Sequence, residues 1–122
     1  MARWDKFGPW ALVIGATLFC CGHAWAHHSF ASTFLKQSIT IDGKVVEFLF
    51  RSPHSVVLVE TLDEKRQPIT WAAEWGTAGQ LSRIGIEKDT LKPGDHVIIN
   101  GYPSRNAADH RMFIVDITRP SD

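Results

Sequence analysis

Residues 38–50 read SITIDGKVVEFLF, and their apolar pattern indicates how the sheet is built. Its apolar side chains change from odd-numbered to even-numbered positions along the stretch: Ile39, Ile41, Val46, Phe48 and Phe50. Successive side chains of a β-strand point to opposite faces of a sheet, so a slip of one residue turns the apolar set to the other face. The pattern predicts one long strand with a bulge or coil near Gly43, which lets the strand serve two parts of a curved sheet.

Four later segments also carry strand patterns. They read SVVLVETL at 55–62, ITWAAEW at 69–75, HVIINGY at 96–102 and RMFIVDIT at 111–118. Between the third and fourth strands, Thr77 and Gln80 have the spacing of a helix capping box, and Gly85 ends a short apolar stripe. This order of three strands, one short helix and two strands predicts an all-β, five-stranded OB-like Greek-key barrel. A flat sheet or open sandwich is the alternative, and the helix favours the barrel because an OB barrel uses a helix there to plug its end.

The alternation along these strands also predicts the core. We expect these side chains to share one core: Val46, Phe48, Trp71, Val97, Val115 and Ile117.

The first 26 residues have the pattern of a secretory signal peptide. A short basic start precedes an apolar run, and Ala24-Trp25-Ala26 places small residues where signal peptidase reads them. A membrane anchor is less favoured because glycine and proline interrupt the run, which is shorter than the roughly 20 residues of a span. A lipoprotein cysteine at Cys20 is disfavoured by the bulky Phe19 before it. Membrane contact is therefore expected only before the signal peptide is removed.

The expected organisation follows from that cleavage. Residues 1–26 form the signal peptide, 27–37 a tether and 38–119 the OB-like barrel of a periplasmic or secreted protein. Both cysteines of the 122-residue chain leave with the signal, and the remainder carries 11 basic and 12 acidic residues. Because nucleic-acid binding depends on concentrated lysine and arginine, this balance predicts no nucleic-acid partner.

Four motifs together resemble a known family. They are AHHSF at 26–30, SPH at 52–54, WAAEWG at 71–76 and RIGIEKDTLKPGDHVIINGYP at 83–103. In this combination the chain resembles the uncharacterised bacterial periplasmic family called domain of unknown function 6152. The resemblance implies a small exported OB-like domain and brings no biochemical activity. It also implies recurrent positions at His27, His28, Pro53, His54, Trp71, Glu74, Gly85, Gly94 and Gly101.

Catalytic motifs are missing from the sequence. It contains no G-x-S-x-G elbow, no phosphate-cradling glycine loop and no H-E-x-x-H helix, and the mature chain has no cysteine nucleophile. A non-enzymatic function is therefore favoured.

The histidines suggest a metal site. With His27 as first residue, its free amine and ring could chelate a metal, whereas His28 would bind with the amine and the intervening amide. Imidazole nitrogens favour copper, which heads the divalent affinity order. His54 is the best further ligand, and its loop is expected to adjoin the loop that carries His110. The predicted metal residues are thus His27, His28, His54 and His110, with copper as the most plausible cofactor.

Each candidate also has a structural alternative. His54 can cap its loop, and His110 can be an ordinary loop residue. Glu74 can be a site carboxylate or the cross-strand partner of Lys44 or Arg111, and Trp71 can be a ligand platform or part of the core. Two functions therefore remain: a copper-binding protein, or an OB-type module without metal that binds a small ligand or an unidentified periplasmic protein.

Overall fold

The computed structural model describes residues 30–121. The chain divides into two units, Met1–Thr33 and Phe34–Asp122, and the first is described only over residues 30–33, which form one helical turn. The predicted signal peptide and His27 and His28 lie outside the described residues. Within residues 30–121, no helix is long and apolar enough to cross a membrane.

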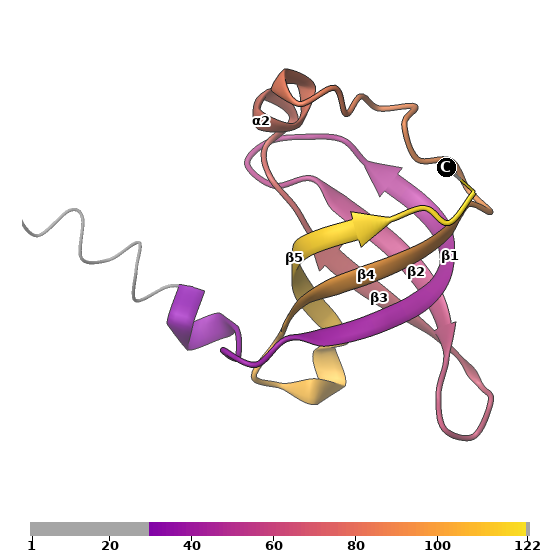
Figure 1. Ribbon diagram of the computed structural model, residues 1–122. Helices are drawn as coiled ribbons and strands as arrows, with labels where there is room; N and C mark the ends of the chain where they lie inside the picture. The colour runs from indigo at the N-terminus through magenta and orange to yellow at the C-terminus, as the bar shows by residue number, and fades with distance from the viewer. Residues whose placement is uncertain (1–29, 122) are drawn as a thin grey trace, which may run out of the picture. The chain divides into compact units, whose positions relative to one another are not determined.

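The second unit is a closed five-stranded barrel (Figure 1). Its elements in chain order are β1 (Ile39–Leu49), β2 (Val56–Leu62), β3 (Pro68–Glu74), α2 (Ala78–Arg83), β4 (His96–Pro103), the 3-10 turn η1 (Ala107–Asp109) and β5 (Arg111–Thr118). The strands pair in the order β1-β2-β3-β5-β4, and β4 pairs again with β1. All pairs are antiparallel except β3 with β5. The predicted barrel with one helix between its third and fourth strands is confirmed.

The helix begins at the predicted capping box. The Thr77 hydroxyl accepts the Gln80 backbone N–H at 3.1 Å, and the Gln80 side chain accepts the Thr77 N–H at 3.0 Å. These two bonds satisfy N–H groups that have no partner inside a helix. Leu81 is buried, so the short helix covers one end of the barrel with a single apolar anchor.

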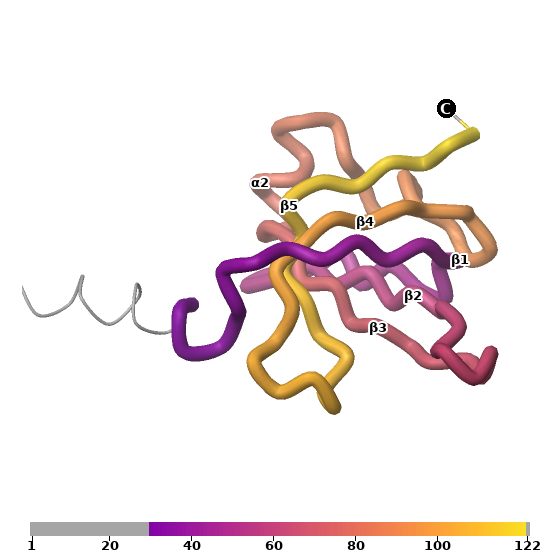
Figure 2. Tube along the Cα trace, turned by 60° about the horizontal axis from the view of Figure 1, so that its bottom comes forward, coloured from indigo at the N-terminus to yellow at the C-terminus, as the bar shows by residue number. Residues whose placement is uncertain are grey.

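Strand β1 serves two neighbours, as the change of phase predicts. Its first half pairs with β4, from Ile39 to Lys44 (Figure 2), and its second half pairs with β2, from Lys44 to Leu49. The bulge lies between Val45 and Glu47 rather than at Gly43. Gly43 has a different role: a Cβ atom there would lie 2.3 Å from the Glu60 carbonyl oxygen, so only glycine lets the two strands approach this closely.

The core is formed by buried side chains from all five strands. Fully buried members are Val57, Val59, Ala73, Val97, Ile99 and Met112. Of the predicted core residues, Val97 is confirmed, and Phe48, Trp71 and Ile117 are partly buried against the core.

The prediction that Val46 and Val115 belong to the core is wrong, because these residues are 45% and 51% exposed. Each is the extra residue of a bulge. Val46 falls between the pairs that Val45 and Glu47 make with β2, and Val115 falls where the β4–β5 register shifts. The extra residue of a bulge has no partner across the ladder, and the alternation restarts after it. Val45 and Ile114 therefore take the buried places.

Before β1, residues 34–38 run beside the end of β4. Phe34 is buried, forms an isolated bridge with Ser104, and has its ring 6.0 Å from that of Phe113. The Leu35 N–H donates to the Pro103 carbonyl at 2.9 Å. The C-terminal part of the predicted tether is therefore fixed to the barrel.

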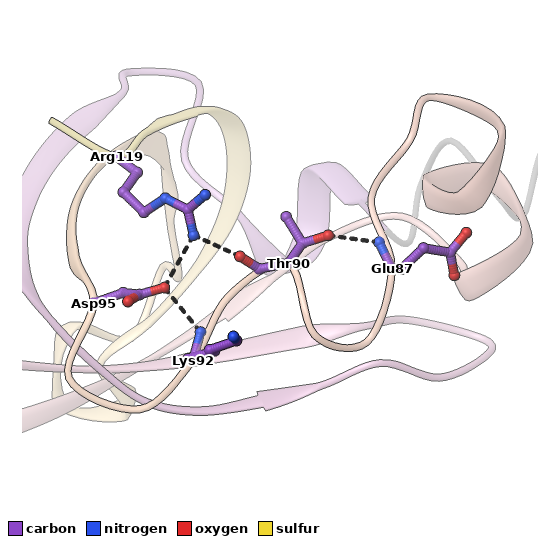
Figure 3. Close-up of polar contacts among 5 residues, drawn as sticks. All are labelled: Glu87, Thr90, Lys92, Asp95 and Arg119. Atoms are coloured by element: carbon purple, nitrogen blue, oxygen red, sulfur yellow. Dashed lines mark hydrogen bonds and ion pairs between the residues drawn. The ribbon is translucent and has the colours of Figure 1, made fainter. Parts of the chain in front are cut away.

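The connection between α2 and β4 is fixed to the end of β5 by polar contacts (Figure 3). The Arg119 guanidinium donates to the Thr90 carbonyl at 2.6 Å and to the Asp95 carboxylate at 3.1 Å. The same carboxylate accepts the Lys92 N–H at 2.9 Å. The pKa of Asp95 is lowered mainly by the hydrogen bond from the Lys92 N–H, and to a smaller extent by the contact with Arg119.

This arrangement predicts a pH-dependent effect of Asp95→Asn. A carboxyl whose pKa is lower in the folded state contributes stability above its unfolded pKa of about 4, and loses it as pH falls through the folded value. We expect the variant to melt below the wild type at pH 7 and the gap to close in acid. Thermal melts between pH 2.5 and 7 measure this, with Asp89→Asn, an exposed carboxyl on the same connection, as control. A difference in melting temperature between Asp95→Asn and the wild type that stays constant with pH would contradict the lowered pKa of Asp95.

Candidate ligand-binding groove

A groove of about 400 Å³ opens at the end of the barrel opposite α2. Figure 1 shows α2 at one end of the barrel, and the β4–β5 loop with η1 at the other. The floor of the groove is apolar: Leu35, Ile39, Ile69, Trp71 and Pro103. Its rim comes mostly from the β4–β5 loop: Ser104, Arg105, Asn106, Ala107, His110 and Arg111. We call this feature the Trp71–His110 groove.

A second hollow continues the groove along the barrel mouth. It has a volume of about 550 Å³, shares Ile39, Ile69 and Trp71 with the first, and reaches the β2–β3 turn at Asp63 and Glu64. That turn is held by the Asp63 carboxylate, which accepts the N–H groups of Lys65 and Gln67, each at 2.8 Å. The two hollows together make an elongated surface between the β4–β5 loop and the β2–β3 turn, apolar around Ile39, Ile69 and Trp71 and polar toward Asp63 and Glu64.

The β4–β5 loop is organised by its own side chains. The Asp109 carboxylate accepts the Ser104 hydroxyl at 3.1 Å and the Asn106 amide at 2.9 Å. The Asn106 side chain also accepts the Ala108 N–H at 3.3 Å, which caps η1. The rim of the groove is therefore shaped by bonds within the loop, and binding does not have to order it.

His110 ends η1 in an unusual backbone conformation. Its φ of 45° and ψ of 47° lie in the left-handed region, which costs a residue other than glycine about 1 to 3 kcal/mol. Two contacts hold it: its carbonyl accepts the Ala72 N–H at 2.9 Å, and its ring meets Trp71 edge to face with centroids 5.4 Å apart. Strained residues of this kind cluster at functional sites.

An ion pair between Glu74 and Arg111 lies beside the groove. The Glu74 side chain is 17% exposed and the Arg111 side chain 42%. The hydrogen bond and the charge of Glu74 raise the pKa of Arg111. The interpretation of Glu74 as a cross-strand partner of Arg111 is confirmed, and its carboxylate orients the guanidinium at the groove rim.

The expectation that the loops of His54 and His110 adjoin is wrong. The loop after β1 contacts the start of α2: the Ala78 N–H donates to the Arg51 carbonyl at 3.1 Å, and the Ser55 N–H to that of Gly76 at 3.0 Å. The long β1 strand carries this loop, with the exposed His54, to the α2 end, whereas the loop of His110 lies at the other end (Figure 1).

The predicted metal residues are not brought together in the described part of the chain. Residues 30–121 contain no group of three histidine, cysteine, aspartate or glutamate side chains that could hold a metal ion. The pairing of His27 or His28 with His54 falls outside the described residues. His96 is exposed, and its ring lies 2.7 Å from the Asp42 carboxylate.

Most of the groove was not predicted from the sequence. Asn106 followed by Ala-Ala-Asp has the pattern of a capped turn, but the pattern does not show that this loop forms the rim of a groove. Trp71 was named, but Ile39 and Ile69 were assigned to strands with no binding role. A strand pattern alone does not reveal that the barrel mouth exposes them.

Comparisons with known proteins agree with the fold. A family model described as "Family of unknown function (DUF6152)" matches residues 16–113. The mitochondrial single-stranded DNA binding protein Rim1 of S. cerevisiae superposes with a TM-score of 0.51 and 12% identity, covering 67% of this chain and 91% of that chain.

A small single-stranded DNA-binding protein of Streptomyces coelicolor gives a TM-score of 0.41 and 13% identity, covering 70% and 92%. No curated protein matches the chain. At such low identity the likeness to the yeast structure supports the OB fold alone.

The strain at His110 predicts a small stability effect for His110→Gly. Glycine adopts the left-handed conformation freely, which offsets the loss of a ring contact of about 0.5 to 1.5 kcal/mol. We expect the free energy of unfolding to change by less than about 1 kcal/mol, measured by urea denaturation. Arg66→Gly is the matched control, because Arg66 also has a positive φ of 61° but lies in an exposed turn. A loss above about 2 kcal/mol for His110→Gly alone would make the histidine a structural support of the fold.

Proposed function

The chain belongs to the family of unknown function DUF6152, and we propose that its OB barrel is a binding module whose ligand occupies the Trp71–His110 groove. One observation carries this proposal. A strained histidine and a hydrogen-bonded loop form a fixed rim over an apolar floor that includes Trp71. Ligand sites are typically concave and mostly apolar, have a few placed polar groups, and enclose about 300 to 1,000 Å³.

The chemistry of the groove favours a ligand with an apolar part. The floor offers aliphatic side chains and the Trp71 indole, and the polar groups are confined to the rim. At that rim, Arg111 is held in place by Glu74 and can meet a carbonyl or carboxylate of the ligand. The hydroxyl–carboxylate contact at the rim, between Ser104 and Asp109, holds the β4–β5 loop together, and the apolar floor suits binding of a ligand.

A larger hollow of about 590 Å³ lies on the outer surface around Asp42 and His96. Its side chains include Lys44, Glu60 and His96, all exposed. Exposed charges of both signs keep their water and contribute little to binding. The Trp71–His110 groove is therefore the better candidate, although it is smaller.

Single-stranded DNA, which the yeast neighbour's name includes, is not the ligand that we propose. Non-specific single-strand binding uses stacked aromatic rings and a positively charged groove. The OB face that binds oligonucleotides is the outer surface of the second and third strands. In this chain its outward side chains are Val56, Leu58, Glu60, Leu62, Pro68, Thr70, Ala72 and Glu74. This set contains no aromatic and no basic residue.

We further propose that the protein is exported, with cleavage after Ala26 and His27 as the mature first residue. The support is the Ala24-Trp25-Ala26 pattern after an apolar run. Copper binding by His27 and His28 is a second candidate function, favoured by their position directly after this cleavage pattern. His54 or His110 could add a single imidazole in that case, and the loops that carry them lie at opposite ends of the barrel (Figure 1).

The groove proposal predicts where small molecules bind. We expect a library of apolar and aromatic carboxylates, titrated into the isotope-labelled protein, to shift backbone NMR signals of residues 69–72 and 104–111. Apolar fragments gain most where a mostly apolar cavity is already formed. An oligothymidylate titration in the same buffer should leave the spectrum unchanged. Fragments that shift only signals around α2, or an oligonucleotide that shifts the β2–β3 face, would contradict the proposal.

The copper hypothesis predicts a dependence on the free amino terminus. The intact mass of the exported protein should first match a start at His27. Copper(II) titration should then give much tighter binding to this form than to a version with one extra residue before His27, because the extension removes the terminal amine from the chelate. His54→Ala tests the third ligand, and His96→Ala is the control. Equal affinity in all forms excludes a terminal copper site.

A further inference from the structure

Strand β3 has one fully paired edge and one partly paired edge. Its ladder with β2 runs over the whole strand, from Pro68 opposite Leu62 to Glu74 opposite Val56. Its parallel ladder with β5 covers only Ala72 to Glu74. In the described part of the chain, residues 68–71 therefore have no strand on the side that faces the Trp71–His110 groove.

The backbone groups of Thr70 point to this open side. The Ala72 N–H donates to the His110 carbonyl, so the backbone groups of Ala72 face β5. Alternate residues of a strand direct their N–H and C=O groups to the same side, so those of Thr70 also point away from β2. The next donor of the parallel ladder would be the His110 N–H, but the left-handed turn directs it to the Ala107 carbonyl at 3.4 Å.

Thr70 is consequently left with an N–H and a C=O that have no partner among the described residues. The flanking side chains of Ile69 and Trp71 lie on the groove side of the strand and line its floor. A backbone donor and acceptor at strand spacing, next to an apolar hollow, is the arrangement used in peptide recognition by strand addition.

We propose that an extended peptide segment joins the edge of β3, pairs with the backbone of Thr70 and places an apolar side chain in the Trp71–His110 groove. This inference rests on the proposed function and names the class of its ligand. An extended polypeptide supplies both a carbonyl and an N–H to one strand residue. Every second side chain of such a peptide lies on the same face, so one of them can enter the groove. An apolar small molecule would fill the groove and leave both groups of Thr70 without a partner.

Pro68 limits the number of N–H donors on the open edge of β3. Pro68 has the same orientation along β3 as Thr70, two residues away, but it has no N–H to donate. An added strand can therefore take only one N–H donor from residues 68–71, the one on Thr70. Short edges that carry proline resist uncontrolled pairing between sheets, so recognition depends on the groove as well as on the backbone.

Two variants of Thr70 separate the role of its backbone N–H from that of its side chain. Thr70→Pro removes the donor, and it should leave the β2 ladder intact because the Thr70 N–H does not take part in it; Pro68 already fits this edge. Thr70→Val keeps the N–H and replaces only the exposed hydroxyl. Circular dichroism and thermal melting check that both variants fold.

The test begins with a displayed library of random seven-residue peptides, selected on the purified protein. Enriched sequences are synthesised, and their affinities for the wild type and both variants are measured by fluorescence anisotropy. We expect Thr70→Val to bind as the wild type does, and Thr70→Pro to bind about tenfold more weakly, as expected for loss of a buried hydrogen bond.

A second arm changes only the peptide. Methyl groups placed on successive backbone nitrogens should weaken binding at alternate positions, because alternate N–H groups of a strand face its neighbour. This arm remains decisive if Thr70→Pro fails to fold. A uniform response along the peptide would contradict strand addition.

The outcomes separate this inference from the function on which it rests. Peptides that shift NMR signals in the groove but bind Thr70→Pro and Thr70→Val equally would overturn strand addition and leave the groove as the site. A library without enriched sequences would also overturn strand addition, while the fragment titration tests the groove independently. Peptides that shift signals only around α2 would overturn both.

Discussion

The short parallel ladder between β3 and β5 both closes the barrel and limits how far its mouth is covered. It closes the barrel with three residue pairs and ends where His110 turns into the left-handed region. If β5 continued to pair toward Pro68, it would occupy the edge of β3 at Thr70. The turn instead diverts the chain into η1, whose capped loop becomes the rim of a groove. Closure of the barrel and opening of its mouth therefore have the same cause.

The two ends of the barrel have different roles for this reason. At one end, the capped helix α2 and the network of Arg119, Thr90 and Asp95 fix the connection between α2 and β4. At the other end, the β4–β5 loop is bonded mostly to itself and leaves the apolar mouth open. An end that is ordered without being covered suits recognition, because its shape exists before the ligand arrives.

The strand order and the capping box could be predicted from local patterns in the sequence, whereas for Glu74 the sequence left Lys44 and Arg111 as alternative partners. The exposure of Val46 and Val115 could not be predicted, since periodicity shows that a phase changes but not which residue is the extra one. The position of His54 depended on how far β1 runs beyond its pairing with β4, which is a property of the whole barrel. The conformation of His110 also escaped prediction, because a left-handed histidine is set by tertiary contacts with Ala72 and Trp71.

The left-handed turn at His110 leaves the groove-side edge of β3 open at Thr70, and the proposed peptide site depends on this. Hydrogen exchange of single backbone amides in the unliganded protein, followed by NMR, measures whether that edge is open. The amides of Trp71 and Ala72 are bonded to neighbouring strands and should exchange slowly, whereas that of Thr70 between Ile69 and Trp71 should exchange fast. Protection of Thr70 equal to that of Ala72 would mean that the edge is already paired, and would contradict the account.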